Sequence, residues 1–188
     1  SGKSTLARLM IGLERPSEGR VLINGVDTTK WGLREWRKYR GKIQAVFQDA
    51  GGTLNPSWST SKNVEEALVN LTDLSPSQRK NRIAELMDQT GLSKSLLDTP
   101  VRKLSGGEQR RLALLRSLSI SPEFLILDEV TAGLDLISTE AVLQLLEKYE
   151  QEHDCAYLVI THDIQVASRL CEVIYEIEHG KFTKKAVR

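Results

Sequence analysis

Hydrophobic residues recur along this chain with two spacings, which separate the expected helices from the expected strands. Apolar residues three and four positions apart lie on one face of a helix, whereas a short uninterrupted apolar run is typical of a strand buried in a parallel sheet. The segments with helical spacing are 4–12, 83–90 and 142–149. The segments expected to form strands are 20–24, 42–47, 124–127, 156–160 and 173–177. We expect the last three of these strands to be buried.

The order of these elements predicts an α/β fold with a mostly parallel sheet, because strands alternate with helices. The middle of the chain contains only helical patterns. There Asn63 looks like a helix N-cap, and Ser75 repeats that signal with Pro76 at the first helical position. We therefore predict a single domain, with a core formed by 1–48 and 119–188 and a helical subdomain inserted at 49–118.

The composition of the 188 residues is that of an ordinary globular protein, with 40% hydrophobic and 27% charged residues. Lysine and arginine total 26 and aspartate and glutamate total 25, which gives a formal net charge of +1. A broad nucleic-acid-binding face would need a clustered excess of basic residues, so we expect no nucleic-acid partner. The longest apolar runs reach only about five residues, against about 20 for a membrane-spanning helix.

The first candidate for chemistry is Gly2–Thr5, which reads Gly-Lys-Ser-Thr. This is the second half of the phosphate-binding pattern G-x-x-x-x-G-K-[ST]. The first glycine of that pattern would fall upstream of Ser1, so we expect the natural chain to extend upstream and to include a preceding strand. Lys3 would reach the β- and γ-phosphates, and Ser4 would hold Mg²⁺. The alternative is a polar turn that starts a surface helix.

Two carboxylates, Asp128 and Glu129, directly follow the apolar run 124–127. Ligands of open α/β sheets bind at the carboxyl ends of the strands, which is where these side chains fall. Asp128 can hold the shell of a Mg²⁺ ion, and Glu129 can polarise an attacking water. The alternative is an acidic N-cap of the next helix.

A second candidate anion site is Leu104–Glu108, which reads Leu-Ser-Gly-Gly-Glu at the start of a helical segment. A hydroxyl and glycine N–H groups at a helix start can bind phosphate. The alternative is that Ser105 is an ordinary N-cap followed by flexible glycines. One nucleotide does not need two phosphate-binding helix starts so far apart in the chain. Two such sites make sense if each covers a different nucleotide and a partner subunit faces this one.

At this point the chain resembles the nucleotide-binding domain of ABC transporters over essentially its whole length. The matching segments, in the family's order, are Gly2–Thr5 (the end of Walker A), Gln48 (the Q-loop), Leu104–Glu108 (the signature), Asp128 and Glu129 (Walker B and the catalytic glutamate), Ala132–Asp135 (the D-loop) and His162 (the switch histidine). Two positions depart from the family pattern. Glu108 stands where glutamine is commoner, and Ala132 stands where the family usually has serine.

This resemblance implies a P-loop NTPase core that hydrolyses ATP at a dimer interface. The catalytic residues it implies are Glu129, His162 and Gln48. The residues it implies for ATP are Ser1, Gly2, Lys3, Ser4, Thr5 and Asp135, with Ser105, Gly106 and Gly107 facing the partner's nucleotide. The Mg²⁺ ligands it implies are Ser4, Gln48 and Asp128. The implied partners are a second ABC ATPase subunit, membrane-spanning permeases and a solute-binding protein, with the chain at the cytoplasmic face of the membrane.

A narrower resemblance concerns the segment after the expected strand 42–47. Phe47-Gln48-Asp49 followed by Thr53–Pro56 is similar to a stretch of the peptide and nickel importer ATPases, with departures at Ala50 and Thr53. The sequence leaves peptide and metal undecided as the transported substrate. A soluble ABC ATPase that acts on nucleic acid or ribosomes is the alternative, and a P-loop kinase is a weaker one because it does not explain Leu104–Glu108.

Overall fold

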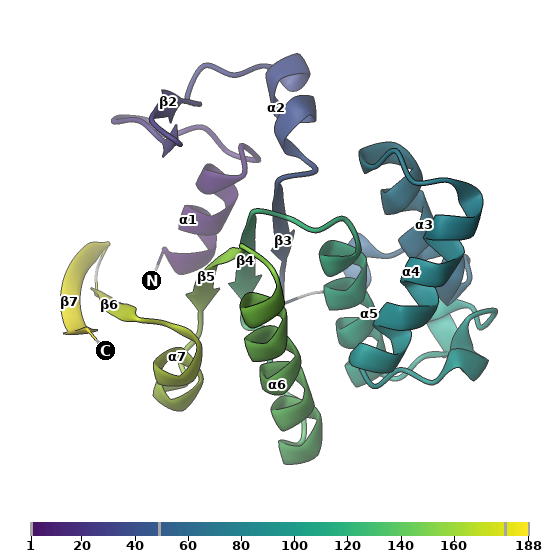
Figure 1. Ribbon diagram of the computed structural model, residues 1–188. Helices are drawn as coiled ribbons and strands as arrows, with labels where there is room; N and C mark the ends of the chain where they lie inside the picture. The colour runs from purple at the N-terminus through teal and green to yellow at the C-terminus, as the bar shows by residue number, and fades with distance from the viewer. Residues whose placement is uncertain (1, 49, 179, 188) are drawn as a thin grey trace.

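The structure is a computed structural model that describes residues 2–48, 50–178 and 180–187 (Figure 1). Its centre is a parallel sheet with the strand order β3-β4-β5, formed by Ile43–Val46, Phe124–Asp128 and Ala156–Ile160. In the register of the strands Val46 pairs with Leu127, and Asp128 pairs with Ile160. The carboxyl ends of the three strands therefore meet at one edge of the sheet. The predicted strands at these positions and their parallel arrangement are confirmed.

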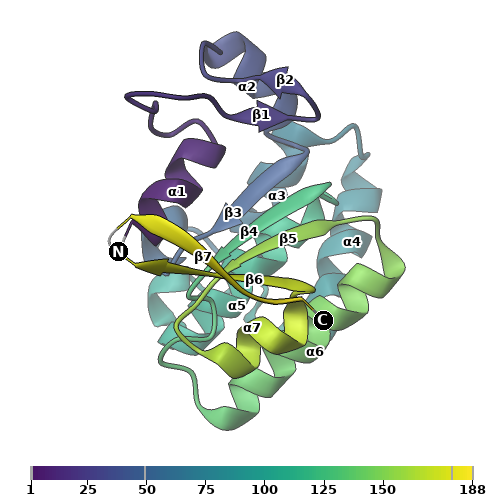
Figure 2. The same ribbon diagram turned by 90° about the vertical axis from the view of Figure 1, so that its left-hand side faces the viewer.

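Helices cover both faces of this sheet, as a parallel sheet requires. On one face Ala7 of α1 (Lys3–Met10) packs with Ile126 and Ile160. On the other face Leu125 and Leu127 belong to a larger cluster. Two further helices, α6 (Leu136–Glu152) and α7 (Ile164–Leu170), contribute buried side chains to that cluster. Figure 2 shows these two helices side by side next to the sheet. Successive residues of β4 thus point to opposite faces, with Phe124 and Ile126 in the cluster of Ala7 and Leu125 and Leu127 in the larger cluster.

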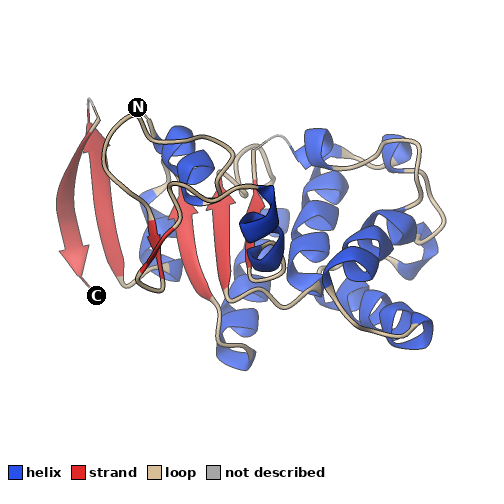
Figure 3. Cartoon of the chain, turned by 90° about the horizontal axis from the view of Figure 1, so that it is seen from above, coloured by secondary structure: helices blue, strands red, loops and turns tan. Residues whose placement is uncertain are grey.

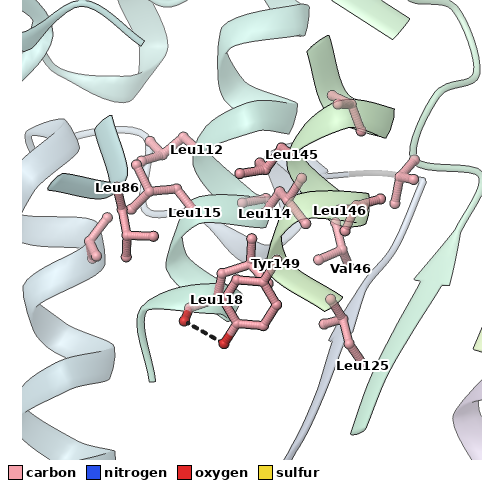
Figure 4. Packing of buried hydrophobic residues seen from close by; sticks show 14 of the residues in the cluster. Val46, Leu86, Leu112, Leu114, Leu115, Leu118, Leu125, Leu145, Leu146 and Tyr149 are labelled. Atoms are coloured by element: carbon pink, nitrogen blue, oxygen red, sulfur yellow. Dashed lines mark hydrogen bonds between the residues drawn. The ribbon is translucent and has the colours of Figure 1, made fainter. Parts of the chain in front are cut away.

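The helix-only segment forms its own group beside the sheet, as Figure 3 shows. It consists of α3 (Thr60–Leu71), α4 (Pro76–Gln89) and α5 (Gly106–Ser119), with short 3-10 helices at Ala50–Thr53, Lys94–Leu96 and Val101–Lys103. Leu86, Leu112 and Leu115 pack between these helices, and Leu114 and Leu118 continue the same cluster toward Val46 and Tyr149 (Figure 4). Because this cluster is continuous, α5 joins the helical group to the sheet.

The expected N-cap at Asn63 is wrong. α3 begins at Thr60, and Ser59 caps it by accepting a hydrogen bond from the Lys62 N–H at 3.2 Å. Asn63 is buried inside the helix, where its side chain accepts from the Asn55 N–H at 2.8 Å and donates to the Asn55 carbonyl at 3.1 Å. It therefore fixes the turn that precedes the helix. The expected N-cap at Ser75 of α4 is confirmed.

The remaining elements lie at the periphery. β1 (Leu22–Ile23) pairs with β2 (Val26–Asp27), α2 spans Leu33–Tyr39, and β6 (Val173–Glu178) pairs with β7 (Lys181–Val187). The expected strand at 173–177 is present as β6, but the prediction that it is buried is wrong, since β6 lies in a separate antiparallel hairpin and exposes Val173 and Tyr175. Glu176 and Glu178 interrupt its apolar run, and no residue of β6 is fully buried. Among the described residues, no helix combines the length and the apolar character that crossing a membrane demands.

Candidate functional site

The first component of the site is the start of α1. Gly2 caps this helix in the left-handed conformation, with φ of 89°, which glycine adopts without strain. Its carbonyl accepts the first helical hydrogen bond, from the Leu6 N–H at 3.0 Å. The N–H groups of the first turn, including those of Lys3 and Ser4, then have no acceptor within the helix and can bind an anion. Ser1, which the sequence also assigned to this site, lies outside the described residues.

The second component is Asp128, the last residue of β4. Its side chain is buried, with 4% exposure, and among the described residues its Oδ1 atom has no hydrogen-bond partner. Buried carboxylate oxygens are normally hydrogen-bonded or bind a cation, because an isolated buried charge is costly. An oxygen donor of this kind suits Mg²⁺, so Asp128 fits the role of a metal ligand.

The third component is the pair formed by Glu129 and His162. The carboxylate oxygens of Glu129 lie 2.9 and 3.0 Å from Nδ1 of His162. Glu129 has a φ of 53°, the left-handed region that non-glycine residues rarely adopt, and its N–H donates to the Ile160 carbonyl at 2.9 Å. Such strain costs about 1–3 kcal/mol and is concentrated at functional sites. Two neighbouring strands thus bring together residues that are far apart in the sequence.

Gln48 follows β3 by two residues and is exposed. Since Val46 is paired with Leu127 in the sheet, Gln48 lies at the same edge as Asp128 and Glu129. Glu129 is 14% exposed and His162 is 74% exposed at their side chains, so the pair borders solvent. The structure thus gathers most of the residues expected to act on the nucleotide at the carboxyl edge of the sheet.

The segment Leu104–Glu108 lies at the start of α5. Ser105 is the N-cap, and its hydroxyl accepts from the Glu108 N–H at 3.3 Å. The Glu108 carboxylate in turn accepts from the Ser105 N–H and from the Ser105 hydroxyl, each at 2.8 Å. These two hydrogen bonds hold the pKa of Glu108 below its ordinary value. The plain N-cap interpretation of Ser105 is therefore correct as local geometry, while Ser105 and Gly106 remain exposed.

Asp135 ends the segment Ala132–Asp135 and caps α6. It accepts from the Ser138 N–H at 2.8 Å and from the Ser138 hydroxyl at 2.9 Å, and these bonds hold the pKa of Asp135 below its ordinary value. Asp135 is exposed, so its carboxylate is accessible at the surface.

Two arginines of α5 bind this segment and the first turn of α6; they directly follow the signature resemblance, which assigned them no role. The Arg110 guanidinium donates to the Ala132 carbonyl, and Arg111 donates to the Ser138 hydroxyl at 3.3 Å. The Asp-x-x-Ser spacing of Asp135 and Ser138 is a readable capping signal. The contact between Arg110 and Ala132 joins residues far apart in the sequence, so no local sequence pattern predicts it.

A helix start with free N–H groups, a buried aspartate and a strained glutamate near the carboxyl edge of a parallel sheet form the arrangement expected of a nucleotide-binding domain. Residues 1–132 match the family described as ABC transporter, and the chain belongs to this family. The resemblance noted in the sequence is confirmed, as are the fold class and the assignment as an ABC ATPase.

Related proteins agree with this membership. The nickel import ATP-binding protein NikE of Rhodospirillum rubrum is 36% identical over 186 residues, which cover 99% of this chain and 67% of that protein. NikE of Escherichia coli K12 is also 36% identical over 186 residues, covering 99% of this chain and 69% of that protein. The chain thus spans about two thirds of these relatives.

Solved structures similar to this chain are also described as parts of ABC transporters. The dimeric structure of MJ0796, described as a bacterial ABC transporter cassette, has a TM-score of 0.90 and 32% identity over 100% of this chain and 81% of that one. The structure of cbiO1 from Clostridium perfringens, described as part of the ABC transporter complex cbiONQ, has a TM-score of 0.82 and 31% identity over 97% of this chain and 71% of that one.

Proposed function

We propose that this chain is the ATPase subunit of a nickel importer and that it hydrolyses ATP with Mg²⁺ at an interface with a second ABC ATPase subunit. Family membership supplies the ATPase class. The two NikE relatives described above favour nickel over peptide as the substrate. The observation that carries the catalytic assignment is the Glu129–His162 pair, next in the chain to Asp128, whose Oδ1 has no hydrogen-bond partner within the described part of the chain.

In this proposal the residues at the sheet edge bind the phosphates, hold the metal ion or activate water. Gly2, Lys3, Ser4 and Thr5 bind the phosphates through helix-start N–H groups and the Lys3 ammonium. Asp128, Ser4 and Gln48 hold Mg²⁺, which neutralises charge on the phosphate oxygens when it is bound. Glu129 orients and polarises the attacking water, and His162 fixes the Glu129 carboxylate through its Nδ1 atom.

The second subunit completes the site. Ser105, Gly106 and Gly107 of one subunit face the γ-phosphate bound by the other, and Asp135 lies at the same interface. The exposure of Ser105, Gly106 and Asp135 supports this placement, and MJ0796, a structural relative, is described as dimeric. Contacts to the γ-phosphate exist only while the two subunits are closed, so ATP favours the closed state and hydrolysis lets them part.

The partners in the membrane belong to the same proposal. We assign 1–48 and 119–188 to the RecA-like core and 49–118 to a helical subdomain, which the separate grouping of α3–α5 supports. A groove between them is lined in part by Trp36, Tyr39, Phe47 and Leu71. We assign it to the membrane-spanning permease, because it adjoins the segment that carries Gln48. A solute-binding protein would deliver the substrate, with this chain at the cytoplasmic face.

Nickel uptake by the organism that encodes the chain tests the proposal. Cells lacking the gene should lose high-affinity uptake of radioactive nickel, and the full-length wild-type gene should restore it. Lys3→Ala should fail to restore uptake at equal protein level, because the phosphate-binding ammonium is gone. A control, Lys62→Ala, changes an exposed lysine of α3 and should behave like wild type. Normal nickel uptake with lost peptide uptake in the deletion strain would assign the transporter to peptides instead.

A further inference from the structure

The contacts of Glu108 differ from those of a simple helix cap. A serine hydroxyl has a single proton to donate. In this structure the Ser105 hydroxyl gives its proton to Oε2 of Glu108 at 2.8 Å, while its oxygen accepts from the Glu108 N–H at 3.3 Å. Hydrogen bonds to a charged acceptor are roughly twice as strong as neutral ones. The hydroxyl proton of Ser105 is therefore already committed within its own subunit.

We propose that Glu108 is a positioning residue that holds the Ser105 hydroxyl in the separated subunit and must release it before Ser105 can donate to a phosphate held by the partner. This inference rests on the proposed function, because it concerns the same interface between two subunits. Breaking the hydrogen bond between Ser105 and the Glu108 carboxylate costs free energy when the subunits close. An uncharged residue at position 108 would lower this cost.

A second cap in the same chain shows what an uncharged residue does at the equivalent position. At the start of α4, Gln78 stands three residues after Ser75, as Glu108 stands after Ser105. The Gln78 side chain accepts from the Ser75 N–H at 2.8 Å, and the Gln78 N–H donates to the Ser75 hydroxyl at 3.4 Å. The Ser75 hydroxyl instead lies 3.1 Å from the Ser77 hydroxyl. A glutamine thus preserves the cap while the serine hydroxyl pairs with another hydroxyl.

The charge on Glu108 supports the same conclusion. The Ser105 N–H, the Ser105 hydroxyl and the nearby Arg111 guanidinium all favour the ionised carboxylate, so the pKa of Glu108 lies below its ordinary value. At neutral pH the acceptor is therefore a carboxylate. Glu108→Gln is nearly isosteric and converts this charged acceptor into a neutral one, which weakens the hold on the hydroxyl without removing side-chain bulk.

The test measures ATP-driven dimerisation of the full-length protein by analytical ultracentrifugation. Glu129→Gln is included in every variant so that ATP is not consumed. Glu108→Gln should lower the ATP concentration for half-maximal dimerisation by ~3- to 30-fold, the range expected when a charge-assisted hydrogen bond becomes a neutral one. Its melting temperature should stay close to that of the parent. A loss of structure alone would not lower the ATP concentration needed for dimerisation.

Two further variants separate the hydroxyl from other effects. Glu35→Gln makes the same change at the equivalent capping position of α2, where Glu35 accepts from the Gly32 N–H at 2.9 Å, and it should leave dimerisation unchanged. In a Ser105→Ala background, Glu108→Gln should give no gain, because there is no hydroxyl to release. A gain that persists without the hydroxyl would overturn the inference, as would an unchanged or weakened response of Glu108→Gln.

The same measurements distinguish a wrong subunit interface from a wrong role for Glu108. If the protein with Ser105 and Glu108 intact shows no ATP-driven dimerisation at all, the proposed interface between subunits is wrong, and the role of Glu108 is wrong with it. If that protein dimerises with ATP and Glu108→Gln does not shift the ATP requirement, only the role assigned to Glu108 is wrong.

Discussion

Single residues set the geometry around the site, and Asn63 is the clearest case away from the chemistry. Its buried side chain binds both the N–H and the carbonyl of Asn55, and its amide also donates to the Ser59 carbonyl at 3.0 Å. These bonds fix the turn between the Gln48 segment and α3. A buried polar group of this kind stabilises the fold only while all of its partners remain in place.

Asn63→Ala should therefore destabilise the protein by about 2 kcal/mol, because it removes the buried side chain that pairs with both the N–H and the carbonyl of Asn55. For a chain of this size, a loss of that order lowers the melting temperature by roughly 4–8 °C. Differential scanning calorimetry of the full-length protein gives the shift. Asn70→Ala is the matched control, since Asn70 is exposed and its side chain hydrogen-bonds to Glu66 of its own helix. Equal melting temperatures for the two variants would contradict the role of Asn63.

Asp135 predicts a pH-dependent contribution to stability. Hydrogen bonds from Ser138 lower the pKa of Asp135 from its ordinary 3.8, so folding favours the charged carboxylate. The resulting stabilisation is present above pH 3.8 and is lost as the pH falls through the lower value of the folded state. The wild type should exceed Asp135→Asn in urea midpoint at pH 7, and the gap should shrink at pH 3. A gap that widens on acidification would contradict this account.

At the scale of elements, the starts of α5 and α4 have similar caps, but we expect only one of them to contact a second subunit. Ser105 of α5 and Ser75 of α4 are both N-caps with a side-chain acceptor three residues later. Only the α5 start carries two glycines, and its first half is tied to the segment 132–138 through Arg110 and Arg111. We therefore expect only α5 to take part in the subunit interface.

Ser105→Arg should spare nucleotide binding by the isolated full-length subunit and block its ATP-driven dimerisation, because the larger side chain fills the space intended for the partner's phosphate. Ser75→Arg places the same side chain at the equivalent cap of α4 and should leave dimerisation intact. Size exclusion with a fluorescent ATP analogue reports both quantities. Normal dimerisation of Ser105→Arg would refute the facing-nucleotide arrangement.

The elements also mark what a sequence can and cannot predict. The three parallel strands, α4 and the cap at Ser75 follow from local patterns, because apolar runs and capping residues report directly on burial and helix starts. The true start of α3 did not follow, since Asn63 and Ser59 both have cap-forming side chains and only tertiary contact with Asn55 decides between them. The strand at β6 was predicted, but its burial was misjudged, because its pairing with β7 in a separate hairpin is not local information.

In the site, too, some features could be predicted from the sequence and others depend on tertiary contacts. Asp128 and Glu129 could be assigned from their position after an apolar strand, and the resemblance to the family added Gln48 and His162. The sequence did not reveal that Glu129 adopts a positive φ or that Oδ1 of Asp128 has no partner among the described residues. The contacts of Arg110 and Arg111 with the 132–138 segment were also missed, because they depend on how α5 packs against the sheet.

At the scale of the whole molecule, the sheet and the helical group are joined by one apolar cluster that runs through α5. α5 carries Ser105 at its start, and its arginines hold the segment that leads to Asp135. A shift of α5 would therefore move Ser105 and the segment that leads to Asp135 together, relative to the sheet edge that carries Glu129. This arrangement suits a subunit in which closure onto a partner is coupled to ATP, with two discrete states that the nucleotide biases.

The central claim is that Glu129 activates water for ATP hydrolysis, and Glu129→Gln in the full-length protein tests it most directly. The amide keeps the size of the side chain but cannot polarise water as a carboxylate does. We expect affinity for ATP and Mg²⁺, measured by equilibrium titration with a fluorescent analogue, to stay within a few-fold of the wild type, while steady-state hydrolysis falls by ~10²–10⁴-fold. Turnover within a few-fold of the wild type would contradict the assignment.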